Sequence, residues 1–299
     1  MKVLVLLIGE QILPNLLPLK YIKPDVSVAV FSDFSKRGYV RLEQVVQGKI
    51  KMQPCQVDAY NIEAIIPVLM DTLGRWGPPH ELWFNITGGT KPMSIAAYLS
   101  AEQLHAPVIY FQSEGKRSRV LHYEFWDGKP ILTGNEILPA VITLDEYLQA
   151  HVDLSPPRQR GEPDEYGYRF QNCIYEALTG IVDEIKKTFY LQGVVEIDLA
   201  VRCENQVGIV EIKTGKNGVK AAIDQLTEAT EQRYLGTYTQ KFLVTDQDLS
   251  LKTDLKELAS AHHISIIELP GFKQTGSINE TEAGDLRNTI LNGLGRKTS

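Results

Sequence analysis

Hydrophobic positions in the first half of the chain form short continuous runs. The runs are Lys2–Ile8, Val26–Phe31, Leu82–Ile86 and Val108–Phe111. Stretches with helical spacing lie between them, at Ile12–Ile22, Gly38–Gly48, Ile62–Leu73 and Pro92–Leu104. Apolar runs of about four to eight residues that alternate with helices are typical of a parallel sheet covered on both faces. The first half is therefore predicted to be a doubly wound, Rossmann-like α/β domain.

The second half has a different order of elements. A long helical pattern at about Asp164–Thr188 precedes two strands, Val194–Cys203 and Val207–Lys213. Helices and strands then alternate, at Val219–Gln232, Lys241–Thr245, Leu249–His262 and Ile264–Leu269. This α-β-β-α-β order predicts a second, separate α/β domain.

The domain boundary is marked by composition. Prolines, a glycine and charged residues crowd between Asp153 and Pro163, which is typical of an exposed connector. A chain of 299 residues is also long enough for two domains. We expect domains at residues 1–140 and 164–299, joined by a linker at 141–163. Residues 271–299 are polar and contain glycines, so we expect a partly mobile tail there.

Acidic residues on the two predicted strands of the second half carry the clearest candidate chemistry. Glu196 and Asp198 share one face of the first strand, because side chains two apart point the same way. Glu211 and Lys213 share one face of the second strand for the same reason. A hard divalent cation would relieve repulsion between such carboxylates, and a lysine can orient water or stabilise charge on a phosphate. The pattern indicates a metal-dependent phosphodiesterase; a solvated Glu/Lys pair on an edge hairpin is the alternative.

The hairpin register decides whether the acids meet. A two-residue turn at Glu204-Asn205 would put Asp198 directly opposite Glu211. A turn at Asn205-Gln206 would put Asp198 opposite Lys213 and diagonal to Glu211. A longer loop would add a bulge and leave the register open.

Residues 165–270 resemble the PD-(D/E)xK nuclease superfamily in element order and motif spacing. Asp198, Glu211 and Lys213 match its motif, although Ile197 stands where the motif has proline. The resemblance implies that Mg²⁺ or Mn²⁺ is held by Asp198, Glu211 and the backbone carbonyl of Ile212, while Lys213 orients the attacking water.

The same resemblance assigns supporting roles to three further residues. Glu196 and Glu176 would be outer ligands of the metal, with Glu176 on the helix that precedes the hairpin. Gln225, on the helix after the lysine, would position the site.

A glycine-containing loop is the sharpest binding candidate of the first half. The run Leu82–Ile86 leads into Thr87-Gly88-Gly89-Thr90-Lys91, and Pro92 opens the next helix. Free N–H groups at a helix start, two threonine hydroxyls and a lysine make an anion site. The chain has neither the Walker A pattern nor a G-x-G-x-x-G after its first strand, so nucleoside triphosphate and dinucleotide binding are not indicated. The alternative is a turn whose glycines serve tight packing alone.

The segments Asn85–Ala101 and Val5–Pro18 resemble the CARF domain, the CRISPR-associated Rossmann fold. Nearly the whole chain looks like the CARF–PD-(D/E)xK effector nucleases of type III CRISPR defence. In that family a CARF homodimer binds a cyclic oligoadenylate across its two-fold axis, and binding activates the nuclease. The resemblance implies a homodimer that is activated by cyclic tetra-adenylate and cleaves DNA, RNA or both.

The CARF resemblance also implies the residues that meet the ligand. The loop that would contact its phosphates and riboses consists of Thr87, Gly88, Gly89, Thr90 and Lys91. Residues that would lie nearby, matched by position rather than by motif, are Gly9, Glu10, Gln11, Ser32 and Gln112.

Bulk composition narrows the remaining possibilities. A net charge of −6 lacks the basic signature of a high-affinity nucleic-acid binder, so substrate affinity is expected to be modest and salt-sensitive. Local phosphate contacts are expected from Lys213, Lys216, Lys220 and Arg233. Three widely spaced cysteines argue against a zinc site and a disulfide framework. No run is long enough to span a membrane, and a cytoplasmic location is expected.

Two other functions are compatible with these patterns. The second domain could be a pseudo-enzyme, which would make the chain a non-catalytic cyclic-nucleotide sensor. The chain could also be a ligand-independent DNA repair or restriction nuclease with an accessory Rossmann domain.

Overall fold

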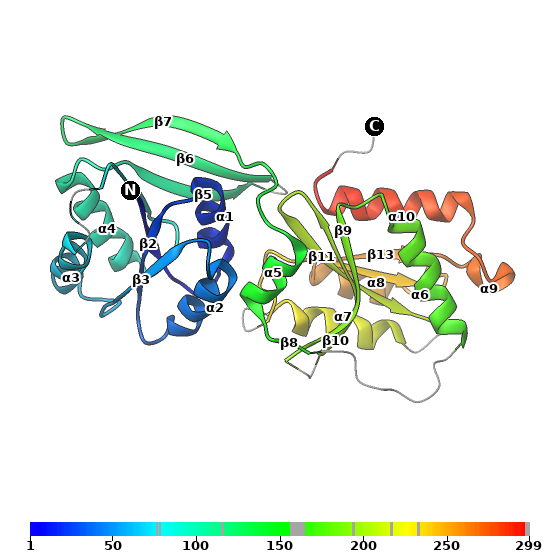
Figure 1. The fold of residues 1–299 in the computed structure, drawn as a ribbon. Coiled ribbons are helices and arrows are strands. Elements are labelled where there is room, and N and C mark those ends of the chain that lie inside the picture. Colours follow the sequence, from blue (N-terminus) through cyan, green and yellow to red (C-terminus); the bar gives the residue numbers. More distant parts are fainter. Residues whose placement is uncertain are drawn as a thin grey trace. The chain divides into compact units, whose positions relative to one another are not determined.

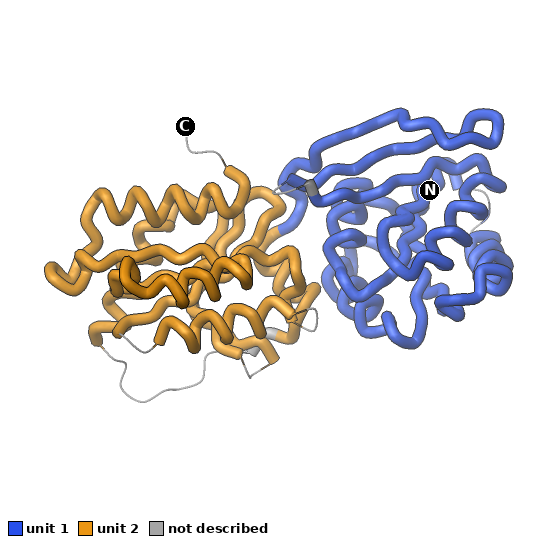
Figure 2. Tube along the Cα trace, turned by 180° about the vertical axis from the view of Figure 1, so that it is seen from behind, with its two compact units in different colours: residues 1–142 blue, residues 143–299 orange. Residues whose placement is uncertain are grey.

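The structure is a computed structural model that describes residues 1–75, 77, 79–114, 117–155, 165–192, 195–215, 218–231 and 234–296 (Figure 1). The chain divides into two compact units, Met1–Ile142 and Thr143–Ser299 (Figure 2). The first unit contains a seven-stranded sheet and the second a six-stranded sheet. The expected pair of α/β domains is therefore present.

The first sheet has the strand order β3-β2-β1-β4-β5-β6-β7. Its parallel strands are β1 (Lys2–Leu7), β2 (Val26–Phe31), β3 (Lys51–Gln56), β4 (Glu81–Asn85) and β5 (Val108–Glu114). Two antiparallel strands extend it, β6 (Arg117–Trp126) and β7 (Lys129–Ile137). The predicted doubly wound parallel sheet is confirmed as the core of this larger mixed sheet.

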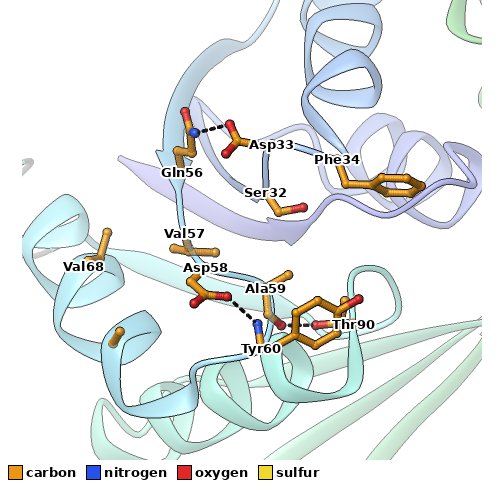
Figure 3. Close-up of a pocket in the computed structure, with 11 residues that line it drawn as sticks. Ser32, Asp33, Phe34, Gln56, Val57, Asp58, Ala59, Tyr60, Val68 and Thr90 are labelled. Atoms are coloured by element: carbon orange, nitrogen blue, oxygen red, sulfur yellow. Dashed lines mark hydrogen bonds between the residues drawn. The ribbon is translucent and has the colours of Figure 1, made fainter.

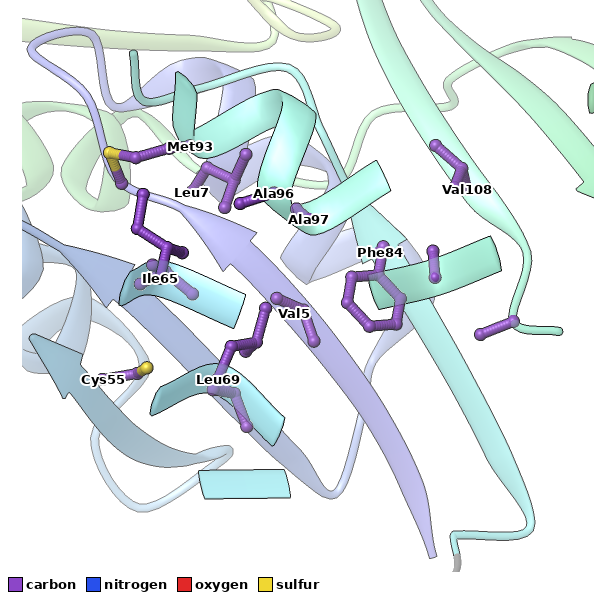
Figure 4. Packing of buried hydrophobic residues seen from close by; sticks show 14 of the residues in the cluster. Val5, Leu7, Cys55, Ile65, Leu69, Phe84, Met93, Ala96, Ala97 and Val108 are labelled. Atoms are coloured by element: carbon purple, nitrogen blue, oxygen red, sulfur yellow. The ribbon is translucent and has the colours of Figure 1, made fainter. Parts of the chain in front are cut away.

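Helices cover both faces of the parallel strands, which explains their continuous apolar runs. The helices are α1 (Leu13–Ile22), α2 (Lys36–Val46), α3 (Ile62–Gly74) and α4 (Lys91–Gln103). Figure 4 shows one side of this core, where Val5 and Leu7 of β1 pack with Ile65 of α3 and Met93 of α4. The alternate residues Leu4 and Leu6 are also fully buried, since the strand has no solvent face.

Strands β3, β6 and β7 were not predicted, because none of them carries an apolar run. β3 is an edge strand with the sequence Lys51-Met-Gln-Pro-Cys-Gln. A proline is tolerated there because an edge strand leaves one row of N–H groups unpaired. β7 forms the opposite edge, and most of its side chains are exposed.

The second sheet has the strand order β13-β12-β11-β10-β9-β8. The strands are β8 (Leu154–Ser155), β9 (Glu184–Leu191), β10 (Val195–Cys203), β11 (Gln206–Lys213), β12 (Gln240–Thr245) and β13 (Ile264–Glu268). One face packs in a hydrophobic core with helices α6 (Glu165–Leu178) and α10 (Glu280–Gly293). Helix α7 (Gly218–Ala229) connects β11 to β12, and helix α8 (Thr253–Ala261) connects β12 to β13.

The long helix expected at Asp164–Thr188 is shorter in the structure. α6 ends at Leu178, the backbone turns at Gly180 with a φ of 77°, and Glu184–Leu191 forms strand β9. The buried aromatic residues Phe189 and Tyr190 favour a strand that pairs with β10. The segment 141–163, expected as a linker, contributes helix α5 (Leu144–His151) and strand β8 to the second unit.

The expected mobile tail is corrected for residues 271–296, which hold α9 (Phe272–Thr275) and α10. Leu286, Ile290 and Leu294 recur at four-residue spacing, so they share one helix face, and all three are buried in the core of the second unit. A capping box between Asn279 and Glu282 begins α10. The polar composition of this segment hid an amphipathic helix.

This packing makes the second unit depend on its last helix. We expect Leu286→Ala to lower the free energy of unfolding by about 2–5 kcal/mol, because it deletes a fully buried side chain. Leu251→Ala is the matched control, since Leu251 is 95% exposed and should change stability by less than about 0.5 kcal/mol. Urea unfolding followed by circular dichroism measures both; equal effects would contradict the packing of α10.

Candidate functional site

The turn between β10 and β11 fixes how the acidic residues face each other. Cys203 pairs with Gln206, which leaves the two-residue turn Glu204-Asn205. Continued along the antiparallel ladder, this register puts Asp198 opposite Glu211. The first of the two registers considered from the sequence is therefore the one that forms.

The hairpin and helix α7 bring together Asp198, Glu211, Lys213 and Gln225, which are the three motif residues and the expected positioning residue. Asp198 Oδ2 accepts a hydrogen bond from the Ile212 N–H at 2.8 Å. Glu211 Oε2 accepts from Gln225 Nε2 of α7 at 3.0 Å, and Glu211 Oε1 forms an ion pair with Lys213 Nζ. Both carboxylates thus sit on adjacent strands with the lysine and the amide beside them.

Glu196 lies at the edge of the same cluster. Gln225 Nε2 also donates to the backbone carbonyl of Glu196, at 2.5 Å. The hydroxyl of Tyr190 donates to Glu196 Oε2 at 2.7 Å, so a residue of β9 holds this carboxylate. Tyr190 was missed from the sequence because it falls between the helix expected to end at Thr188 and the strand expected from Val194, where no element was predicted.

Glu176, which was expected as an outer ligand, stays a prediction. It is exposed on α6, and it is not among the charges that most perturb Glu211. The helix instead reaches the hairpin through Gln171, whose Nε2 donates to the backbone carbonyl of Asp198 at 3.3 Å and to Thr188 Oγ1 at 3.2 Å. No sequence signal separated Gln171 from other polar residues of this helix.

The cluster combines three carboxylates with one lysine, and the Glu211 carboxylate is buried. Glu211 is only 1% exposed, and burial raises its pKa to about 8, with further increases from the charges of Asp198 and Glu196. Burial lowers the pKa of Lys213, but the attraction of Glu211 and the other two carboxylates outweighs it and raises the pKa above its ordinary value. A bound cation would relieve this excess of negative charge.

The donor set fits a hard divalent cation. Two carboxylates on opposed strands are oxygen ligands of the kind that Mg²⁺ and Mn²⁺ prefer. Within the described residues no three His, Cys, Asp or Glu side chains gather around one point, so a metal here would rest on Asp198, Glu211 and a main-chain oxygen such as that of Ile212. Lys216 and Arg233, expected as phosphate contacts, lie outside the described residues.

The glycine loop of the first unit, residues Thr87–Lys91, lies between β4 and α4. Its strand β4 neighbours β1 at the point where the strand order reverses, which is where doubly wound sheets bind ligands. A Cβ on Gly88 would lie 2.0 Å from the backbone oxygen of Leu7, and one on Gly9 would lie 3.0 Å from the nitrogen of Gly89. The β1 loop and the β4 loop therefore touch through backbone atoms that only glycine leaves accessible.

Two buried asparagines hold these loops in place. Asn15 Nδ2 donates to the backbone oxygen of Leu7 at 2.8 Å, and Asn85 Nδ2 donates to that of Pro14 at 2.8 Å. Asn85 Oδ1 accepts from both the N–H and the hydroxyl of Thr87, at 3.2 and 2.6 Å. Sequence reasoning missed this pair, although a lone amide inside the apolar run Leu82–Ile86 was a usable signal.

The threonines of the loop are engaged by the protein itself. Thr87 Oγ1 also accepts from the N–H of Phe111 at 2.6 Å. Thr90 is the N-cap of α4, and its hydroxyl donates to the backbone oxygen of Ala59. Because both hydroxyls shape the loop, an anion here would rely on backbone N–H groups at the helix start and on the exposed Lys91.

The other expected ligand contacts differ in their surroundings. Gln11 is half-buried, and within the described part of the chain its Nε2 is a buried donor that lacks a hydrogen-bond partner. Such donors are rare in folded proteins, and a bound ligand would satisfy this one. Glu10 and Gln112 are exposed, while Ser32 lines a cavity together with Thr90. In the described residues no helix is long and apolar enough to cross a membrane.

The raised pKa of Glu211 predicts how stability depends on pH. The folded state holds a proton on Glu211 up to about pH 8, whereas the unfolded chain loses it near 4.5. Between these values the folded state binds more protons, so the free energy of unfolding of the metal-free protein falls as pH rises. We expect Glu211→Gln to reduce this slope; chemical denaturation between pH 5 and 8 tests it, and an equal slope in wild type and variant would contradict it.

A protein-family model matches the first unit, and solved structures share the fold of both units. Residues 3–147 match the Card1 CARF domain family. Can2 from Sulfobacillus thermosulfidooxidans, solved in complex with cyclic tetra-adenylate, has a similar fold, with a TM-score of 0.74 and 16% identity over 98% of this chain and 99% of that chain. Protein VC1899 from Vibrio cholerae gives 0.71 and 14%, over 98% of each chain.

A type III CRISPR defence DNA nuclease activated by cyclic oligoadenylate gives a TM-score of 0.61 and 15% identity, over 82% of this chain and 45% of that chain. No curated protein matches the sequence. These identities show a shared fold, and the family match covers the unit that holds the glycine loop. The resemblance to CARF-domain effectors is confirmed to this extent: residues 3–147, which include the first unit and its glycine loop, match the model of the Card1 CARF domain.

Proposed function

We propose that this chain is a metal-dependent endonuclease of type III CRISPR defence that a cyclic oligoadenylate activates. The observation that carries the proposal is the register of the β10–β11 hairpin, which sets Asp198 opposite Glu211 with Lys213 ion-paired to it. That arrangement stands in a chain whose first unit is a CARF domain. The substrate is DNA, RNA or both, since phosphodiester hydrolysis needs only the phosphate and a water at this site.

The residues of the hairpin divide the work of hydrolysis. Mg²⁺ or Mn²⁺ on Asp198, Glu211 and the carbonyl of Ile212 would supply charge neutralisation at the scissile phosphate and a more acidic water. Lys213 orients that water and offers a positive charge to the developing phosphorane oxygens. Gln225 holds the Glu211 carboxylate through its side-chain amide.

Cyclic tetra-adenylate is the activator that we infer for the first unit. Can2, which shares the fold along nearly its whole length, holds this ligand. The glycine loop offers backbone N–H groups to phosphates, and the unsatisfied Nε2 of Gln11 offers a further donor. Activation follows if the ligand binds the active arrangement of the protein more tightly than the resting one.

A homodimer is the assembly that suits a ring-shaped ligand, because a symmetric ligand fits a two-fold axis. The helix that begins at the glycine loop, α4, exposes Ile95 and Leu99. These residues are four apart, so they form one apolar stripe on the helix surface. We infer that this stripe meets its copy in the second subunit.

The catalytic assignment predicts which lysine matters. With Mn²⁺ and cyclic tetra-adenylate, Lys213→Ala should lower the cleavage rate at least about 100-fold, because it removes a donor that acts on the transition state. Lys256→Ala is the control, since Lys256 of α8 forms an ion pair with Glu268 of β13 and not with a residue of the cluster. Labelled RNA, single-stranded DNA and supercoiled plasmid, each with and without the ring, measure the effect and identify the substrate.

The other outcomes of that assay would each favour a different function. Cleavage that needs Lys213 but ignores the ring would indicate a ligand-independent nuclease. Ring binding without cleavage of any substrate would indicate a non-catalytic sensor. Equal rates in Lys213→Ala and wild type would remove the hairpin from the mechanism.

A charge placed in the apolar stripe of α4 tests the proposed dimer interface. Leu99→Asp should convert dimers to monomers in sedimentation velocity, because it places a carboxylate in the apolar stripe on both sides of the two-fold axis. Leu251→Asp, at a leucine that is fully open to solvent in the second unit, should leave the mass unchanged. A dimer that persists in Leu99→Asp would exclude α4 as the interface.

A further inference from the structure

A cavity of about 650 Å³ opens beside the glycine loop, where β2 and β3 end and α3 begins (Figure 3). Its volume is in the range of small-molecule sites, which span roughly 300–1,000 Å³. Neither the CARF motif nor the hairpin explains it. Most of its wall is apolar, with a few polar groups from Asp33, Gln56 and Asp58.

Two exposed aromatic side chains mark this cavity. Phe34 follows β2 and is 80% exposed, and Tyr60 precedes α3 and is 78% exposed. Rings this open to solvent contribute little to the hydrophobic core, yet they offer flat faces to a ligand. Proteins use such rings to stack nucleobases.

The polar groups of the cavity match the edge of adenine. Gln56 Nε2 donates to Asp33 Oδ1 at 2.7 Å, which orients the amide. A side-chain amide that offers one donor and one acceptor is complementary to the N7 acceptor and the N6 amino group of adenine. A base with an oxygen at position 6, such as hypoxanthine or guanine, would present that oxygen to acceptors, including the Asp33 carboxylate. The wall therefore favours adenine.

A hydrogen bond joins the cavity to the glycine loop. The Thr90 hydroxyl donates to the backbone oxygen of Ala59, the residue before Tyr60 (Figure 3). Thr90 lines the cavity and also caps α4, so one residue borders both places. The N–H of Tyr60 donates to Asp58 Oδ1 at 3.0 Å, which fixes the backbone that carries the ring.

We propose that this cavity is a base-reading site that takes one adenine of the ligand, stacked on Tyr60 and read at its edge by Gln56, while the neighbouring phosphate lies at the glycine loop. This inference rests on the proposed function, because it assigns a second part of the same ligand. It makes the first unit selective for the base as well as for the phosphate backbone.

Calorimetric titration of the full chain with two rings tests the proposal. Cyclic tetra-adenylate should bind the wild type at least about 10-fold more tightly than cyclic tetra-inosinate, in which hypoxanthine replaces adenine. Tyr60→Ala should weaken binding of the adenylate ring by about 10- to 100-fold, the range for loss of base–aromatic stacking. Trp126→Ala is the matched control, because Trp126 is similarly exposed on β6, away from the cavity wall.

Two further variants separate stacking and edge reading from a loss of fold. Tyr60→Phe keeps the ring and should bind like the wild type. A ring with one 8-vinyladenine, a fluorescent base that keeps N7 and the 6-amino group, should have its fluorescence quenched by the wild type and by Tyr60→Phe, but less by Tyr60→Ala, since quenching reports stacking. Gln56→Met, of similar shape, should reduce the preference for adenine over hypoxanthine.

The outcomes distinguish this site from the function on which it rests. If the wild type binds neither ring, the proposed activator and the base site both fail. If the wild type binds cyclic tetra-adenylate and Lys91→Ala weakens it, but Tyr60→Ala and Trp126→Ala bind equally well, the activator stands and the base site is wrong.

Discussion

The repulsion between neighbouring carboxylates, of which Glu211 is buried, is the constraint on which the arrangement of the second unit depends. A two-residue turn at Glu204-Asn205 sets Asp198 against Glu211, and one step in register would separate them. The surrounding groups compensate for this repulsion: Lys213 pairs with Glu211, Gln225 bonds it from α7, and a backbone N–H bonds Asp198. These contacts hold the acids together but do not cancel the cost of burying the Glu211 carboxylate, because burial still raises its pKa. A bound cation would offset that cost, which agrees with the metal-dependent function proposed for this site.

In the first unit the constraint is the close approach of two loops, and neutral asparagine side chains stabilise it. Its two ligand loops approach so closely that side chains at Gly9 and Gly88 would collide with backbone. Buried asparagines donate hydrogen bonds to backbone oxygens of the first loop, so the protein's own contacts hold the two loops together. These contacts fix the position of the backbone N–H groups at the start of α4, an arrangement that suits the phosphate-rich ring proposed as the ligand.

The sequence predicted those parts of the fold that repeat a strong pattern. Continuous apolar runs located β1, β2, β4 and β5, and the acid and lysine spacing located the hairpin. Polar edge strands such as β3 were not predicted, because an edge strand needs no apolar run. The sequence did not show which side chain of α6 reaches the hairpin, because that depends on how α6 packs on the sheet: Gln171 bonds the backbone of Asp198, whereas Glu176 is exposed. The contact of Tyr190 with Glu196 and the cavity beside Tyr60 could not be predicted, because each brings together side chains from different elements that meet only in the folded chain.

Metal binding at the hairpin tests the central claim most directly. Titration of Mn²⁺ into the protein, followed by calorimetry, should reveal one saturable site per chain that Asp198→Asn abolishes. Asp224→Asn, at an exposed aspartate of α7, should bind like the wild type. Equal Mn²⁺ binding by all three proteins would contradict the account, because the opposed carboxylates would then hold no metal.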